Sequence, residues 1–192
     1  MSPPQATQQL LACGGRGATA KEEAEPFLLS RHLPWLFPKL KGEALSKKAQ
    51  ELLGNVGIAH VRYPTAGGSG LDDVQPFYAN FPCGLALAHN GNLTNSERLR
   101  KELVSRHRHL NTTSDSEALL NVFAEHLAAN LEARRRGSVG HAGDPLSTPV
   151  SPDTLFDAVE RTMRRCVGGY AVVVLVHNVG VLAFRDPWGI RP

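Results

Sequence analysis

Cysteines, aromatic residues and long apolar runs are all scarce in this sequence. Its 192 residues include only three cysteines, Cys13, Cys83 and Cys166, and aromatic residues make up 6%. An odd number of widely separated cysteines excludes a disulfide framework and a cysteine-based metal site, and it suits a reducing compartment. The longest apolar run, residues 171–176, is too short to cross a bilayer, so we predict a buried strand there and no membrane partner.

Charge of one sign is not in large excess either. The net charge is +3 and the sequence pI is about 8.9. Two dense basic runs, residues 106–109 and 134–136, carry no interleaved aromatic residues, and we interpret them as solvated helix ends or loops. We therefore expect no nucleic-acid partner. A hydrophobic content of 42% in a chain of this length is sufficient for one globular core.

Residues 1–53 differ in composition from the rest of the chain. We interpret them as a divergent N-terminal segment that is poorly ordered or partly helical, with one possible helix over residues 42–53. Residues 1–20 contain Arg16 but no acidic residue, and they are loosely similar to a transit peptide. We expect a cytoplasmic location, with a plastid as the alternative.

From residue 54 onward the pattern predicts a layered α+β domain with mainly antiparallel strands. Strands are expected at residues 56–61, 85–88, 170–177 and 181–185. Three helices are expected between the second and third of these strands. Their predicted starts are a capping box of Thr94 with Glu97, a second one of Ser114 with Glu117, and the pair Ser151-Pro152. Residues 134–150, rich in Gly, Pro, Ser and Arg, are expected to form a surface loop, and Gly168-Gly169 to end the third helix.

The apolar run 85–88 is followed by Asn90-Gly91, where we expect the strand to break. The Asn90 amide is a neutral donor, and Gly91 offers a backbone N–H that no Cβ shields. Two such donors aimed at one point form an oxyanion hole, which stabilises the negative oxygen that develops in acyl transfer. The ordinary alternative for an Asn-Gly pair is a hairpin turn.

Two charged residues follow other element boundaries in a way that suggests a ligand. Arg62 comes directly after an apolar strand, where its guanidinium could hold a carboxylate through two parallel hydrogen bonds. Asp115 lies in the first turn of a predicted helix, where it could bind an ammonium group or merely favour the helix dipole. An amino acid with a side-chain amide, glutamine, would satisfy Arg62, Asp115 and the two donors together.

Six separated motifs, in this order, resemble the glutaminase domain of the amidophosphoribosyltransferase family. They are HVRYPTAG (60–67), QPF (75–77), AHNGNLTN (88–95), TSDSE (113–117), GGYA (168–171) and RDPWGIRP (185–192). The resemblance implies an N-terminal-nucleophile hydrolase fold, an αββα sandwich that is incomplete at the N-terminus. It also implies that residues 54–192 are a partial class II glutamine amidotransferase domain and that the phosphoribosyltransferase domain of the family is absent.

The same resemblance implies a function and a set of site residues. The domain would hydrolyse glutamine and supply ammonia for phosphoribosylamine formation, the first step of de novo purine biosynthesis. Arg62, Thr65 and Asp115 would bind glutamine, and Asn90 with Gly91 would form the oxyanion hole. No metal or cofactor is expected within this chain, because the magnesium of the family belongs to the absent phosphoribosyltransferase domain. Members of the family are homo-oligomers.

The nucleophile is the point at which this sequence departs from the family. The family uses a cysteine at the mature N-terminus, whose own α-amino group serves as the base. Cys13 is a candidate if residues 1–12 are removed, but no strand pattern follows it, and it could instead match a non-catalytic stretch. The alternative function is therefore a non-catalytic module that binds glutamine or a partner protein. Cys83 and Cys166 are interpreted as structural thiols.

Overall fold

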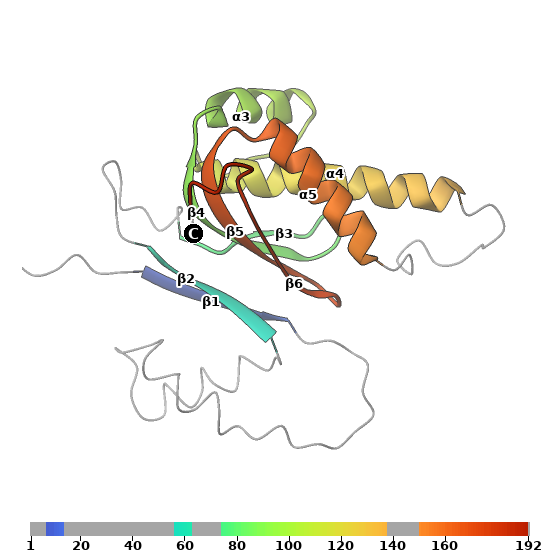
Figure 1. Ribbon diagram of the computed structural model, residues 1–192, viewed down its shortest axis with the longest axis horizontal. Coiled ribbons are helices and arrows are strands. Elements are labelled where there is room, and N and C mark those ends of the chain that lie inside the picture. The colour runs from blue at the N-terminus through green and yellow to red at the C-terminus, as the bar shows by residue number, and fades with distance from the viewer. Residues whose placement is uncertain (1–6, 14–55, 63–73, 138–149, 192) are drawn as a thin grey trace, which may run out of the picture.

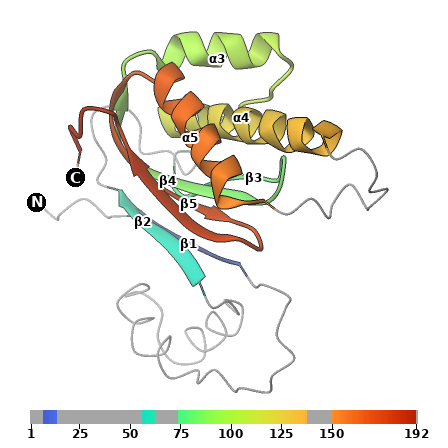
Figure 2. The same ribbon diagram turned by 45° about the vertical axis from the view of Figure 1, so that its right-hand side comes forward.

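The computed structural model describes residues 7–13, 56–62, 74–137 and 150–191, with the backbone alone described for residues 7–13, 61–62 and 137. Within these ranges the chain forms two antiparallel sheets and three helices, arranged as a layer of helices, a four-stranded sheet and a two-stranded sheet (Figures 1 and 2). The predicted helix over residues 42–53 lies outside the described residues.

The larger sheet carries the strands expected from the apolar runs. Its order is β3-β4-β5-β6, and these strands span Phe77–Ala79, Leu85–Leu93, Gly168–Val176 and Gly180–Arg185. The smaller sheet pairs β1 (Thr7–Cys13) with β2 (Val56–Arg62), and β2 packs across β4 and β5. The predicted α+β class with antiparallel pairing is confirmed.

Side chains alternate between the two faces of the large sheet, as the period of two in a strand requires. Leu85 and Leu87 of β4 face the helices, whereas Ala86 and Ala88 face β2, where they meet Ile58. The larger side chains on the outer face fill the space beneath the helices.

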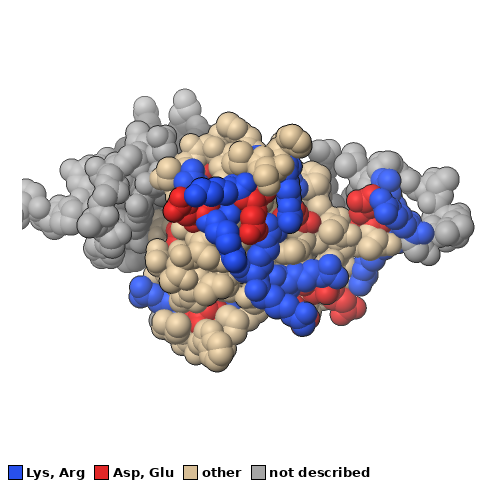
Figure 3. Space-filling view, turned by 90° about the horizontal axis from the view of Figure 1, so that it is seen from above, with Lys and Arg blue, Asp and Glu red and all other residues tan. Residues whose placement is uncertain are grey.

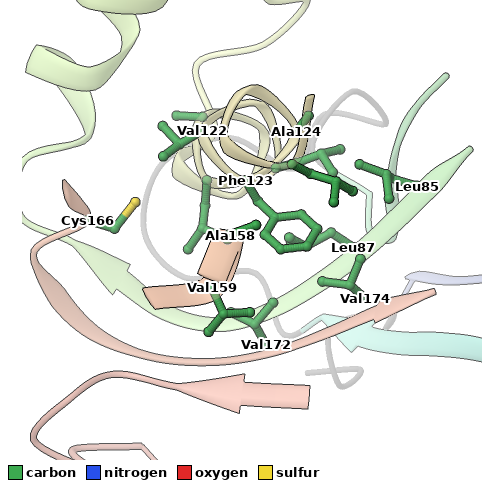
Figure 4. Packing of buried hydrophobic residues seen from close by; sticks show 14 of the residues in the cluster. Leu85, Leu87, Val122, Phe123, Ala124, Ala158, Val159, Cys166, Val172 and Val174 are labelled. Atoms are coloured by element: carbon green, nitrogen blue, oxygen red, sulfur yellow. The ribbon is translucent and has the colours of Figure 1, made fainter. Parts of the chain in front are cut away.

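Three helices cover the outer face: α3 (Ser96–Ser105), α4 (Asp115–Gly137) and α5 (Pro152–Arg165). The apolar stripe of α4 points into the sheet, and Phe123 lies among Leu87, Ala158 and Val174 with no exposed surface (Figure 4). Burial of this stripe is the main stabilising contact between the layers, because apolar area removed from water contributes about 25 cal/mol per Å².

The outer face of the helices is charged but mixed in sign. Figure 3 shows Lys and Arg side chains interspersed with Asp and Glu over this face. The half-buried Arg165 of α5 bridges Glu102 of α3, at 3.1 Å, and Glu125 of α4, at 2.6 Å. Arg106, from one of the two dense basic runs, also contacts Glu125. This cluster ties the three helices together.

The cap predicted for α5 is confirmed and the one predicted for α3 is wrong. Ser151 accepts a hydrogen bond from the backbone N–H of Thr154, with Pro152 as the first helical residue. At α3 the N-cap is Asn95, without a side-chain cap, because Thr94 Oγ1 donates to the carbonyl of Val167 instead. A tertiary contact with the α5–β5 connection thus takes the hydroxyl that the local pattern assigns to the helix.

The start and the end of α4 and the end of α5 also differ from the prediction. At α4, Ser114 Oγ accepts from the Ser116 N–H as a cap would, but Glu117 binds Asn111 and Thr112 rather than closing the box. That helix continues through the first part of the expected loop, to residue 137. The third helix ends at residue 165, and Gly168-Gly169 begins β5 rather than ending the helix.

Two stretches form strands where the sequence indicated something else. Residues 7–13 form β1, which corrects the expectation of a poorly ordered or helical segment for that part of residues 1–53. The strand does not break at Asn90-Gly91 either, because β4 runs on to Leu93. In both cases pairing with a distant strand, β2 or β5, outweighs a local preference.

Candidate active site

A cavity of about 430 Å³ lies between the inner face of the large sheet and β2. Its walls come from four strands: Ala59 and His60 on β2, residues 88–90 on β4, residues 171–173 on β5 and residues 183–185 on β6. The volume is within the range of small-molecule sites. The alanines at four of these positions leave the space open, since longer side chains would fill it.

Asn90 and Gly91 are consecutive residues of β4, and only Asn90 of the two lines this cavity. Asn90 lines it and is exposed, and Gly91 is half-buried with a φ of 146°. A Cβ on Gly91 would lie 2.1 Å from the carbonyl oxygen of Gly169 on β5. Glycine is therefore required here by the close approach of two strands, and the hairpin alternative for Asn90-Gly91 is wrong.

Asp115 is hydrogen-bonded to the same strand, β4. It is the first residue of α4, and its Oδ2 accepts a hydrogen bond from the backbone N–H of Leu93 at 2.9 Å. Its Oδ1 lies 3.8 Å from Nδ1 of His89, and 20% of the side chain is exposed. One carboxylate oxygen thus holds the end of β4, while the other remains available to a cation. Asp115 is not one of the residues that line the cavity.

Arg62 is the last residue of β2, two positions after the cavity-lining His60. Thr65 lies outside the described residues. Cys13 ends β1, and the register pairs it with Val56, whereas Arg62 pairs with Thr7. Cys13 and Arg62 therefore lie at opposite ends of the β1–β2 ribbon, on the order of 20 Å apart along six residues of strand.

Three residues near the site went unnoticed in the sequence, although each falls inside or beside a quoted motif. His89 is 3% exposed and precedes Asn90, and it contacts Gln75 and Ser116, which are also buried. Burial lowers the pKa of His89, with Asp115 opposing that effect and His60 and Arg191 adding to it. The ring is therefore neutral at pH 7. A histidine within an otherwise apolar run was the signal available.

The surroundings of Cys83 and Cys166 are those expected of structural thiols. Cys83 and Cys166 are both unpaired, and burial raises the pKa of Cys166 to about 12. A thiol with such a pKa is a poor nucleophile at neutral pH.

Among the described residues, no three His, Cys, Asp or Glu side chains gather closely enough to hold a metal ion. No described helix has both the length and the hydropathy needed to cross a bilayer.

Comparison with known proteins assigns this chain to a protein family. Residues 69–142 match the model of a glutamine amidotransferase domain. The chain is 51% identical over 144 residues to amidophosphoribosyltransferase of Pseudomonas aeruginosa and 48% identical over 148 residues to that of Escherichia coli. These alignments cover 74% and 77% of this chain. The chain carries a glutamine amidotransferase domain of the amidophosphoribosyltransferase family.

Solved structures agree with this assignment. The amidotransferase domain superposes with a TM-score of 0.56 and 27% identity on a structure described as the allosteric regulatory enzyme of purine biosynthesis, over 83% of this chain and 28% of the other. The corresponding values for the glutamine phosphoribosylpyrophosphate amidotransferase of Bacillus subtilis are 0.51 and 27%, over 75% and 26%. The fold is that of the N-terminal-nucleophile hydrolases, of which the described residues supply one helical layer and two sheets.

The extent of the match is limited in two ways. The chain spans about a quarter of the length of the curated amidophosphoribosyltransferases it matches. The matched domain model covers Asn90, Gly91 and Asp115, whereas Arg62, Thr65 and Cys13 precede its first residue.

Proposed function

We propose that this chain forms the glutamine site of an amidophosphoribosyltransferase, where glutamine is hydrolysed and the ammonia serves phosphoribosylamine formation in purine biosynthesis. The observation that carries the proposal is the placement of Asn90 at the cavity, with Gly91 next to it on the same strand and Asp115 bound to that strand three residues after Asn90. Family membership supports the choice of glutamine among amide substrates.

In this proposal each group meets one part of glutamine. The side-chain amide of Asn90 and the N–H of Gly91 stabilise the oxyanion that forms when a nucleophile attacks the amide carbon. Collapse of that intermediate expels ammonia and leaves an acyl group, which water converts to glutamate. The free oxygen of Asp115 pairs with the substrate ammonium, and Arg62 and Thr65 hold its carboxylate.

The nucleophile separates this proposal from a second candidate function, glutamine binding without hydrolysis. Glutamine extends only about 6 Å from its carboxylate to its amide carbon. Cys13 and Arg62 lie at opposite ends of the β1–β2 ribbon, so they would not reach one bound glutamine in this register. That separation favours the second candidate, unless another nucleophile is supplied.

Three further proposals rest on the same family membership. We infer that the site needs no metal or cofactor, because glutamine hydrolysis uses a nucleophile and neutral donors. We infer a cytoplasmic location, with a plastid as the alternative, from the few, widely separated cysteines and the metabolic role of the family. Homo-oligomer formation, as in the family, is the expected assembly.

The test measures binding and turnover separately on the whole chain. Calorimetric titration with glutamine reports binding, and a coupled assay of ammonia release reports hydrolysis. Binding with release supports the first function, binding without release supports the second, and no binding overturns both. Intact mass after exposure to diazo-oxo-norleucine adds a direct check, since an adduct on Cys13 would assign the nucleophile.

A matched pair of variants tests the role of Asp115. Asp115→Asn keeps an oxygen for the Leu93 N–H but removes the charge, so we expect glutamine affinity to fall by about tenfold or more. Asp153→Asn is the control, because Asp153 also lies in the first turn of a helix but is exposed to solvent and belongs to α5. Equal affinity in the two variants would remove Asp115 from the site.

A further inference from the structure

We propose that Gln75 and Ser116 are positioning residues that act through His89 to hold Asn90 and Gly91 in place. This inference rests on the proposed glutamine site. It concerns residues that would touch neither the substrate nor the reacting atoms. The geometry that points to it is a set of hydrogen bonds at the two ends of the segment 90–92, buried at His89 and half-buried at Leu93.

Among the described residues, no strand pairs with this segment along one of its edges. On one side β4 pairs with β5 along its whole length, from Leu85 to Leu93. On the other side β3 pairs only as far as Leu87, opposite Phe77. From His89 onward, β4 therefore needs other acceptors and donors on that edge, or its polar groups would be left unsatisfied.

The side chain of Gln75 continues the hydrogen bonding along this edge of β4, beyond the last residue pair of β3 and β4. The register of β3 with β4 would place residue 75 opposite residue 89. There the side chain, rather than the backbone, supplies the acceptor, because the His89 N–H donates to Gln75 Oε1 at 2.6 Å. Gln75 is 8% exposed, so little water is available to replace this bond.

Ser116 holds the ring of the same residue. Nδ1 of His89 lies 2.9 Å from Ser116 Oγ, and the two side chains are 3% and 1% exposed. Ser116 belongs to the first turn of α4, next to Asp115, which binds the Leu93 N–H. The segment 90–92 is thus anchored before and after by neighbouring residues of a single helical turn.

The protonation state of His89 is compatible with this role. Burial lowers the pKa of His89, with His60 and Arg191 adding to this effect and Asp115 opposing it, and the neutral ring can share one proton with Ser116 Oγ. Its Nε2 is buried and has no hydrogen-bond partner, which leaves Nδ1 as the anchoring atom. A neutral His89 also leaves the charge of Asp115 free for a substrate ammonium.

The experiment compares variants that lose a buried hydrogen bond near the site or far from it. Ser116→Ala removes the hydroxyl that meets His89. Thr162→Val is the control, because it removes an equally buried hydroxyl, which donates to the Ala158 carbonyl at 2.7 Å on α5. We expect a similar loss of thermal stability in both, and a glutamine affinity about 5- to 10-fold weaker in Ser116→Ala alone.

Gln75 offers an independent test in case Ser116→Ala fails to fold. Gln75→Met keeps the shape but removes the acceptor for the His89 N–H, and Gln75→Glu restores an acceptor. We expect Gln75→Met to weaken glutamine binding and Gln75→Glu to recover most of it. Equal binding by Gln75→Met and the wild type would overturn the role of Gln75.

A double variant distinguishes positioning from a separate contribution. If Ser116 positions Asn90 and Gly91, then adding Ser116→Ala to Asn90→Ala lowers glutamine affinity by a smaller factor than Ser116→Ala does in the wild type. Additive losses would overturn the inference, as would wild-type affinity in Ser116→Ala. Neither result contradicts the proposed function, which is refuted only if the wild-type chain does not bind glutamine. If the wild-type chain does not bind glutamine, both proposals are refuted.

Discussion

Replacing Gly91 with alanine tests the structural reason for the Asn90-Gly91 pair. Two costs combine at this position. A non-glycine residue held at a φ of 146° costs about 1–3 kcal/mol. The new Cβ would also lie 2.1 Å from the Gly169 carbonyl oxygen and 2.7 Å from Tyr170 Cα, and overpacking against backbone adds about 1–3 kcal/mol or more. We expect Gly91→Ala to lower the free energy of unfolding by about 2–6 kcal/mol, a large part of the stability of an ordinary domain.

Gly180 provides the control for the backbone strain alone. Its φ of 139° is similar, but a Cβ there would meet no atom within 4 Å. Gly180→Ala should therefore cost only about 1–3 kcal/mol in urea unfolding followed by circular dichroism. Gly168→Ala should resemble Gly91→Ala, because its Cβ would lie 2.2 Å from the Asn92 carbonyl oxygen. If Gly91→Ala cost no more than Gly180→Ala, the close approach of β4 and β5 would be refuted.

Three other predictions concern stability. Phe123→Ala removes a fully buried ring and should cost about 3–5 kcal/mol in urea unfolding; a loss below 1 kcal/mol would contradict the packing of α4. Arg165→Ala leaves the carboxylates of Glu102 and Glu125 without this partner and should cost about 1–2 kcal/mol, less in 1 M salt, and a salt-independent loss would argue against an ionic origin. Burial raises the pKa of Asp186, but N–H donors from residues 170, 188, 190 and 191 outweigh this and lower it below its ordinary 3.8. The stability that Asp186 contributes should be present above about pH 4 and lost as the pH falls through its folded pKa, and Asp186→Asn should flatten this part of an acid titration of unfolding.

Local sequence signals predicted the elements whose stability depends on their own apolar pattern. The strands at 56–61, 170–177 and 181–185 formed within a few residues of their expected bounds. In α3, Leu99 and Leu103 are fully buried. In these elements the burial of one face and the hydrogen bonding of the backbone favour the same conformation, so a short window is informative.

The errors occurred where a partner distant in sequence decides the conformation. Residues 7–13 carry no strong strand pattern, and their strand exists by pairing with β2. Asn90-Gly91 has the strongest short-range signal for a turn, yet β5 pairs across it because Gly169 can approach Gly91 without a Cβ between them. Thr94 similarly satisfies a carbonyl of the α5–β5 connection instead of capping its own helix.

For the candidate site, the residue types alone indicated the chemistry, because an amide, a guanidinium and a carboxylate keep their hydrogen-bonding character in any fold. The ordered motifs were also sufficient to indicate the family. The distances between the site residues could not be predicted from the sequence. The tie between Asp115 and Leu93, the anchors on His89 and the separation of Cys13 from Arg62 all depend on strand register and helix packing. Such contacts join residues many positions apart, and only the folded chain brings those residues together or keeps them apart.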